Sequence, residues 1–229
     1  MIEPRPSHAR GPADHGWLQS RHSFSFAGYY DPKHMGVSAL RVINDDKVAA
    51  GAGFPAHSHQ DMEIISYVKK GVIEHKDSMG NVEQLPAGEF QLMTAGSGVT
   101  HSEYNPSSTD ALEFLQIWII PDVQGIEPGY QQKRFEPRSG LQLIASPDAR
   151  DGSLLLHQDA CLYQLRLAAG ESARHALATG RKAYLHVVSG EVSVNGERLG
   201  EGDGATISAV DAIDFEALAG SEALLFDLP

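Results

Sequence analysis

His57-Ser58-His59 and His101-Ser102-Glu103 are the two stretches that decide the fold of this 229-residue chain. Each stretch holds two metal-ligating residue types at positions i and i+2. In an extended strand this spacing places both side chains on one face, roughly 6.6 Å apart along the backbone. If the stretches lie on neighbouring strands, three imidazoles and one carboxylate would point to one place. Such a mixed nitrogen and oxygen set suits a divalent transition metal, so the sequence predicts a mononuclear metal site.

The residues around both stretches resemble the two sequence motifs of the cupin barrels. The first motif is matched in order by Gly51, His57, His59, Glu63 and Gly71, and the second by Gly96-Ser97-Gly98, His101 and Asn105. The second motif usually has a proline where this chain has Gly96. Glycines at such positions allow positive φ angles and tight turns between short strands. The combination favours metal binding over isolated structural histidines.

Glu63 is a rival to Glu103 as the fourth ligand. It lies four residues after His59, so a straight strand would place it on the same face as the histidines. The spacing alone does not choose between the two carboxylates.

Charge and composition exclude several classes of protein. The formal net charge is −12, which argues against direct binding to nucleic acid or to an anionic membrane surface, since both need a basic face. No run approaches the roughly 20 apolar residues of a membrane span, and the first residues, MIEPRPSHARG, are polar and proline-rich rather than a signal peptide. Cys161 is the only cysteine, which favours a reducing, cytoplasmic location.

Short apolar stretches separated by glycine, proline, asparagine and aspartate predict an all-β protein. We expect strands at residues 37–43, 62–68, 72–75, 91–94 and 112–120. Residues 122–159 are interpreted as a connector between two halves, with strand-like character only at 141–145 and 154–157.

The second half repeats the pattern of the first half without its ligands. Residues 181–188 followed by Ser189-Gly190 resemble residues 62–68 followed by Gly71. A lone His175 stands opposite the histidine pair, and no histidine corresponds to His101. We therefore expect a C-terminal structural domain without a metal.

The whole chain resembles the pirin family, in particular its bacterial quercetinase-type members. The resemblance is carried by Gly16-Trp17, Phe24-Ser25-Phe26, Tyr29-Tyr30-Asp31-Pro32, residues 40–44, 57–63, 71–81, 94–98, 101–105 and 115–119, and Leu225-Phe226-Asp227-Leu228-Pro229. It implies two stacked cupin (double-stranded β-helix) barrels with metal only in the first. The expected limits are 1–121 for the metal-binding domain, 122–159 for the connector and 160–229 for the metal-free domain.

The resemblance also implies which residues form the site. Pirins use the carboxylate two residues after the second-motif histidine, so the implied ligands are His57, His59, His101 and Glu103, with Glu63 at the edge of the pocket or outside it. Glu103 is in addition the implied catalytic base. The aromatic residues Phe24, Phe26, Tyr29 and Tyr30 could line a substrate entrance, but aromatic residues near an N-terminal strand more often pack that strand onto a barrel, and we expect packing.

The activity implied by the resemblance is a quercetin 2,3-dioxygenase-type reaction, in which a flavonol or a related enolisable substrate is cleaved with O2 to a depside and carbon monoxide. Four ligands on a six-coordinate ion would leave two positions for substrate or water. Fe(II) is the expected divalent cation, and a recombinant sample could instead hold Zn, Ni, Cu, Mn, Co or Cd. The alternative function is a non-catalytic, metal- or redox-responsive regulator that binds a protein partner, because vertebrate pirins are linked to transcriptional regulation and fold does not fix function.

Overall fold

The computed structural model describes residues 1–229 and consists almost entirely of β-strands. Its only helices are two short 3-10 turns, η1 (Ser7–Ala9) and η2 (Arg150–Gly152). The predicted all-β class is therefore confirmed. Neither turn has the length or the apolar character needed to span a membrane as a helix.

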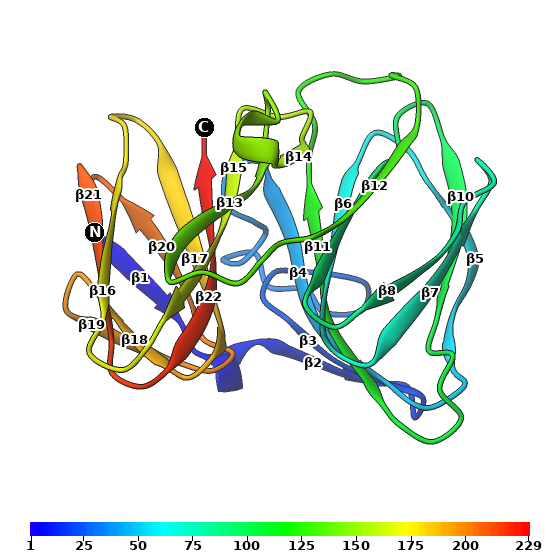
Figure 1. Ribbon diagram of the computed structural model, residues 1–229, viewed down its shortest axis with the longest axis horizontal. Coiled ribbons are helices and arrows are strands. Elements are labelled where there is room, and N and C mark those ends of the chain that lie inside the picture. Colours follow the sequence, from blue (N-terminus) through cyan, green and yellow to red (C-terminus); the bar gives the residue numbers. More distant parts are fainter. The chain divides into compact units, whose positions relative to one another are not determined.

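The chain forms two compact units (Figure 1). Unit 1 contains Met1–Arg10, Val37–Ala39 and Glu136–Pro229, and unit 2 contains Gly11–Gly36 and Leu40–Phe135. Each unit combines one seven-stranded and one four-stranded sheet, as expected for a cupin barrel, and all strand pairs are antiparallel except β13 with β14. Residues 122–159, which we expected to be a connector, contribute strands to both units. The expected domain limits of 1–121, 122–159 and 160–229 stay a prediction.

The two sheets of unit 2 face each other and enclose its interior (Figure 1). The seven-stranded sheet has the order β12-β9-β6-β11-β4-β3-β2, and the four-stranded sheet has the order β5-β10-β7-β8. The bounds are β2 (Gly11–Asp14), β3 (Leu18–His22), β4 (Leu40–Val48), β5 (Gly53–His59), β6 (Glu63–Lys70), β7 (Val72–Asp77), β8 (Val82–Pro86), β9 (Glu89–Thr94), β10 (Val99–Tyr104), β11 (Leu112–Ile119) and β12 (Gly129–Arg134).

The interior of unit 2 is apolar in some layers and polar in others. One cluster of buried apolar side chains includes Val68, Ile73, Leu85 and Phe114, and these residues hold the two sheets together. Elsewhere the same inner faces carry buried polar residues such as His101 and Glu103. Because buried polar groups lower stability unless they find partners, their concentration in one region marks a functional site.

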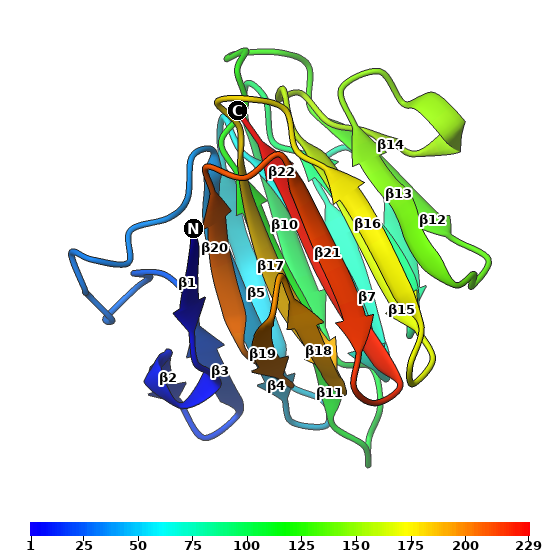
Figure 2. The ribbon, with the colours of Figure 1, turned by 90° about the vertical axis from the view of Figure 1, so that its left-hand side faces the viewer.

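Unit 1 has an apolar interior. Its seven-stranded sheet has the order β1-β20-β17-β22-β15-β13-β14, and its four-stranded sheet has the order β16-β21-β18-β19. Figure 2 shows β1 alongside β20, where Ile2 pairs with Ile207. The interior cluster includes Leu185, Phe215 and Leu225. The bounds are β1 (Ile2–Arg5), β13 (Gly140–Ser146), β14 (Leu154–Leu155), β15 (Cys161–Leu167), β16 (Ser172–Ala176), β17 (Lys182–Ser189), β18 (Glu191–Val194), β19 (Glu197–Gly200), β20 (Gly204–Ser208), β21 (Ala212–Ala217) and β22 (Ser221–Leu228).

Most of the expected strands are present in the structure. Residues 62–68, 72–75, 91–94 and 112–120 correspond closely to β6, β7, β9 and β11. The expected strand at 37–43 was misplaced, because β4 begins at Leu40 and continues to Val48. The run Asn44-Asp45-Asp46-Lys47 is polar, and its place in a central strand could not be foreseen from strand propensity.

Candidate metal centre

His57 and His59 lie at the end of β5, an edge strand of the four-stranded sheet. Pro55 precedes them at a bulge, where two residues of β5, Pro55 and Ala56, stand opposite Ser102 alone. Proline is tolerated there because an edge or a bulge does not need its missing N–H group. The Nδ1 atom of His57 lies 2.8 Å from the carbonyl oxygen of Pro55. A protonated Nδ1 would donate to this oxygen, which leaves Nε2 of His57 free to bind a metal.

His101 and Glu103 lie on the neighbouring strand β10, where buried and accessible residues alternate. Both side chains are buried, whereas Thr100 is exposed. This alternation is the two-residue period of a β-strand, so His101 and Glu103 share the inner face. His101 is the direct cross-strand partner of His57.

The imidazoles of His57, His59 and His101 converge. One potential ligand atom from each lies within 4.8 Å of the others, and the ring centroids are 4.5 to 5.0 Å apart. Burial, followed by the neighbouring His57, lowers the pKa of His59 to about 4. The same causes, with His59 added, lower the pKa of His101 to about 3. Neutral imidazoles with available lone pairs are the form that binds metals.

His101 gives the clearest indication that this cluster fits a metal ion. Its side chain is 1% exposed, and neither ring nitrogen has a hydrogen-bond partner. An unsatisfied buried nitrogen is costly, and a bound cation would remove that cost. Three convergent imidazoles form a donor set for divalent transition metals, so the cluster can hold one such ion.

Glu103 is held at the inner side of the cluster by two donors. The Ser66 hydroxyl donates to its Oε1 at 3.2 Å, and the Gln116 amide donates to its Oε2 at 3.3 Å. Burial raises the pKa of Glu103 to about 7, although both hydrogen bonds oppose this rise. Its carboxylate lies within 4.8 Å of potential ligand atoms of His101 and His75. The assignment of Glu103 as the fourth ligand stays a prediction.

Glu63 lies in a different sheet from the histidines. The chain turns between β5 and β6, with Asp61 at a φ of 49°, so the premise of a straight strand from His59 to Glu63 was wrong. Asp tolerates this left-handed conformation better than most residues. The Glu63 carboxylate is buried and accepts a hydrogen bond from the Thr94 hydroxyl at 3.1 Å.

His75 is a site residue that the sequence reasoning missed. It is the cross-strand partner of Glu103 on β7, it is fully buried, and its Nε2 lies 2.9 Å from Oδ2 of Asp77. Its Nδ1 lies 3.5 Å from Nε2 of Gln91. A signal was present, since His75 and Asp77 have the same i, i+2 spacing as the two quoted stretches.

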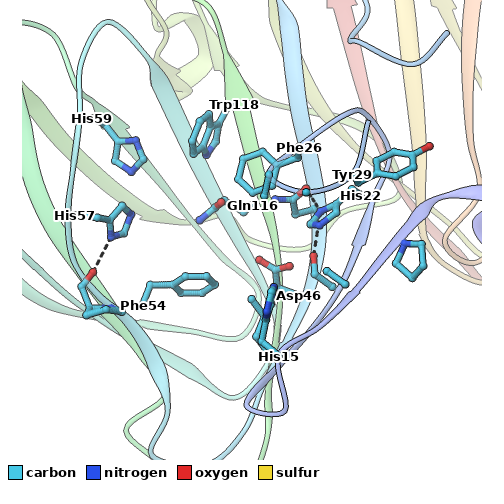
Figure 3. A pocket seen from close by; sticks show the side chains of 18 of the residues that line it. His15, His22, Phe26, Tyr29, Asp46, Phe54, His57, His59, Gln116 and Trp118 are labelled. Carbon is cyan, nitrogen blue, oxygen red and sulfur yellow. Dashed lines mark hydrogen bonds between the residues drawn. The ribbon is translucent and has the colours of Figure 1, made fainter. Parts of the chain in front are cut away.

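A cavity of about 540 Å³ in unit 2 opens beside His57 and His59 (Figure 3). This volume falls within the roughly 300–1,000 Å³ that is typical of small-molecule sites. Aromatic side chains form much of its wall. The rings of Trp118 and His59 are T-shaped with their centroids 5.0 Å apart, and those of Phe26 and Trp118 are T-shaped with their centroids 5.4 Å apart. The cavity can therefore hold a flat, largely apolar molecule next to the histidine cluster.

The expectation that the four N-terminal aromatic residues only pack was wrong for three of them. Phe26 and Tyr29 line the cavity, Phe24 is buried, and Tyr30 is 73% exposed. The reason is that β3 ends at His22, and the following loop bends through an isolated bridge between Phe26 and Tyr29.

Comparison with known families agrees with this architecture. Residues 4–119 match the family model described as Pirin, and residues 143–228 match the model described as Quercetinase C-terminal cupin domain. The chain belongs to the pirin family. The expected family is thereby confirmed, together with the presence of two cupin-type domains.

Individual pirin relatives match over their full length. A protein of Escherichia coli strain K12 named quercetin 2,3-dioxygenase is 56% identical over 229 residues, which cover 100% of this chain and 99% of the relative. The crystal structure of YhhW from Escherichia coli has a TM-score of 0.99 at 55% identity, with 100% of this chain and 98% of that chain covered. A second structure, of the bacterial pirin YhhW in complex with nickel(II), has a TM-score of 0.98 at 55% identity, with 100% and 99% covered.

Proposed function

We propose that this chain is a metal-dependent dioxygenase of the quercetin 2,3-dioxygenase type, which cleaves a flavonol with O2 to a depside and carbon monoxide. The observation that carries the proposal is the convergence of His57, His59 and His101 beside an aromatic cavity of about 540 Å³. The 56% identity to a relative named quercetin 2,3-dioxygenase supports the same activity.

The proposed metal ligands are His57, His59, His101 and Glu103, and the proposed ion is Fe(II). The complex of YhhW with nickel(II) supports a divalent ion in this protein. The proposed donors would also accept Zn, Cu, Mn, Co or Cd in a recombinant sample. When bound, the ion would supply Lewis acidity that lowers the pKa of the flavonol 3-hydroxyl and favours its enolate. Fe(II) is preferred because chemistry with O2 suits a redox-capable ion.

Glu103 is the proposed general base for the 3-hydroxyl proton. Its carboxylate is 2% exposed, so it is protected from bulk water. The donors Ser66 and Gln116 fix the orientation of both carboxylate oxygens. A base that is held in place in this way contributes roughly 10²–10⁴-fold to turnover.

The aromatic wall would orient the flat substrate. Trp118, Phe26 and Phe54 line the part of the cavity that adjoins His57 and His59 (Figure 3). Aromatic rings favour edge-to-face or offset contacts with another ring system, and they exclude water from the reacting end. One quercetin and one O2 contain the same atoms as one depside and one carbon monoxide, so the reaction needs no external reductant.

The decisive experiment combines metal analysis with an activity assay. Freshly purified protein is analysed for metal, stripped, reloaded anaerobically with Fe(II), and mixed with quercetin and O2. We expect loss of quercetin absorbance and release of carbon monoxide in proportion to bound metal. A fully loaded protein that leaves quercetin intact would contradict the proposal and favour the alternative, a metal-responsive protein that binds a protein partner.

A further inference from the structure

A row of polar side chains crosses the inner face of the seven-stranded sheet in unit 2. In the sheet register His22 stands opposite Asn44, and Asn44 stands opposite Gln116. Ser20 stands opposite Asp46, one step further along β3 and β4. Residues two apart on a strand share a face, so these five side chains lie together on the face that lines the cavity.

The members of this row are held by one another. The Nδ1 atom of His22 lies 2.7 Å from Oδ1 of Asn44 and 3.3 Å from the Ser20 hydroxyl. Ser20 also hydrogen-bonds the carboxyl group of Asp46. Neighbours that fix one another's positions form a prearranged polar surface rather than a set of mobile side chains.

Asp46 is the residue of this polar row that has a hydrogen-bonding atom without a partner. Its side chain is 3% exposed, and its Oδ1 is buried without a hydrogen-bond partner. Burial raises the pKa of Asp46 to about 7, and the neighbouring Asp45 adds to this rise. Near neutral pH the carboxyl group is thus available both as a donor and as an acceptor. A buried acceptor without a partner carries a cost that a ligand hydroxyl would relieve.

The cavity places this polar group and the histidine cluster in different regions. In Figure 3, His57 and His59 lie on one side, His22 and Asp46 lie on the other, and the rings of Phe54, Phe26 and Trp118 line the space between them. Such a cavity fits a flat molecule that binds the metal through one part and carries hydroxyl groups on a more distant part.

We propose that Asp46, supported by Ser20, Asn44 and His22, forms a subsite for phenolic hydroxyl groups on the part of the substrate that projects away from the metal. The inference rests on the proposed function, since that function places the chelating part of the substrate at the histidines. It goes further by making Asp46 a specificity-determining residue. The preferred substrates are polyphenols with hydroxyl groups on the pendant ring.

The test is a comparison of binding without O2. The protein is loaded with Zn(II) and titrated anaerobically with quercetin and with the analogue that lacks both hydroxyl groups on its pendant phenyl ring. We expect the parent to bind quercetin about 10-fold more tightly than the analogue, because one hydrogen bond to a buried group commonly changes affinity by that amount. This comparison needs no variant, so it stands even if a substitution unfolds the protein.

Two variants test whether Asp46 causes the difference in affinity between quercetin and the analogue. Asp46→Ala should weaken quercetin binding about 10-fold and leave the analogue within about twofold. Asp45→Ala is the matched control: Asp45 is the adjacent residue on β4, and its carboxylate pairs with Lys69 at 2.6 Å instead of lining the cavity. This control should bind both compounds like the parent.

The possible failures are distinguishable. Equal affinity of the parent for the two compounds, or an equal loss for both in Asp46→Ala, would overturn the subsite whatever the turnover. Selective binding of quercetin that depends on Asp46, without any oxidation by the Fe(II) form, would support the subsite and overturn the proposed dioxygenase.

Discussion

His57 and His101 are direct cross-strand partners on β5 and β10, and their ring centroids are 4.5 Å apart. Strand pairing therefore brings together two residues that are 44 positions apart in the sequence. The bulge at Pro55 lies just before His57 on β5, and the carbonyl group of Pro55 fixes the ring of His57. Because the backbone ladder sets these positions, the imidazoles are arranged for a metal before it binds.

His57→Ala should lose metal and turnover together. The substitution removes one of three convergent imidazoles, and we expect metal affinity to fall by more than about 100-fold, since changes outside the ligand set already cost roughly 10–100-fold. Competition with a chelator measures the affinity. His8→Ala, at an exposed position, is the control and should retain full metal content; parental affinity in His57→Ala would remove His57 from the ligand set.

Glu103→Gln should separate metal content from turnover. The amide keeps an oxygen of similar size, so three histidines and this oxygen retain most of the metal. The loss of basicity should lower kcat roughly 10²–10⁴-fold. The measurement is a single-turnover assay on protein matched for metal content. Turnover at the parental rate would show that the proton leaves by another route.

Much of the candidate metal site could be predicted from spacing, because a strand repeats every two residues. His57 with His59 and His101 with Glu103 each share a face for that reason. The positive φ of Asp61, which separates Glu63 from this face, leaves no comparable periodic signal. The prediction of Glu103 rather than Glu63 as the fourth metal ligand rests on the resemblance to the pirin family and not on spacing.

The polar part of the cavity could not be predicted, because it depends on the register between distant strands. His22 and Asn44 meet only because β3 pairs with β4, and Gln116 joins them from β11. A shift of one residue in either pairing would turn the row to the other face of the sheet. Single-sequence patterns fix which residues alternate, but they do not fix which residue lies opposite which.

Asp46→Asn should change the pH dependence of stability. The pKa of Asp46 is raised from 3.8 to about 7 in the folded protein. Between about pH 4 and 7 the folded state therefore holds a proton that the unfolded state has released, and this group makes stability fall as pH rises. The uncharged amide removes that dependence, so the free energy of unfolding of Asp46→Asn relative to the parent should rise across this range and level off above pH 7. The total rise is at most roughly 4 kcal/mol.

Urea denaturation of metal-free protein at a series of pH values measures this difference. Removing the metal excludes the separate pH dependence of metal binding. Asp45→Asn serves as the control, since Asp45 is partly exposed and paired with Lys69; it should change stability by at most about 1 kcal/mol. A constant difference between Asp46→Asn and the parent across pH 4–7 would contradict the raised pKa.

Gly96→Ala should destabilise unit 2 more than an ordinary glycine substitution does. Gly96 has a φ of 46°, which a proline ring cannot adopt, and this explains why the proline usual in the second cupin motif is missing here. A Cβ atom at this position would lie 2.2 Å from the carbonyl oxygen of Ile126. That carbonyl also accepts a hydrogen bond from the Ser97 amide at 2.7 Å, so it cannot move away without breaking a contact.

The matched control is Gly51→Ala. Gly51 also has a positive φ, 70°, but a Cβ there meets no atom within 4 Å. Gly51→Ala should therefore cost about 1–2 kcal/mol from backbone strain alone, and Gly96→Ala should cost clearly more. The carbonyl group of Gly96 also accepts a hydrogen bond from the Asp61 amide at 2.9 Å. A displacement of the backbone at Gly96 should therefore also disturb the turn that follows His59. Thermal unfolding midpoints measure the loss of stability, and competition with a chelator measures the effect on metal binding near His59. Equal midpoints for Gly96→Ala and Gly51→Ala would contradict the prediction and show that the chain around Ile126 moves to accommodate the added methyl group.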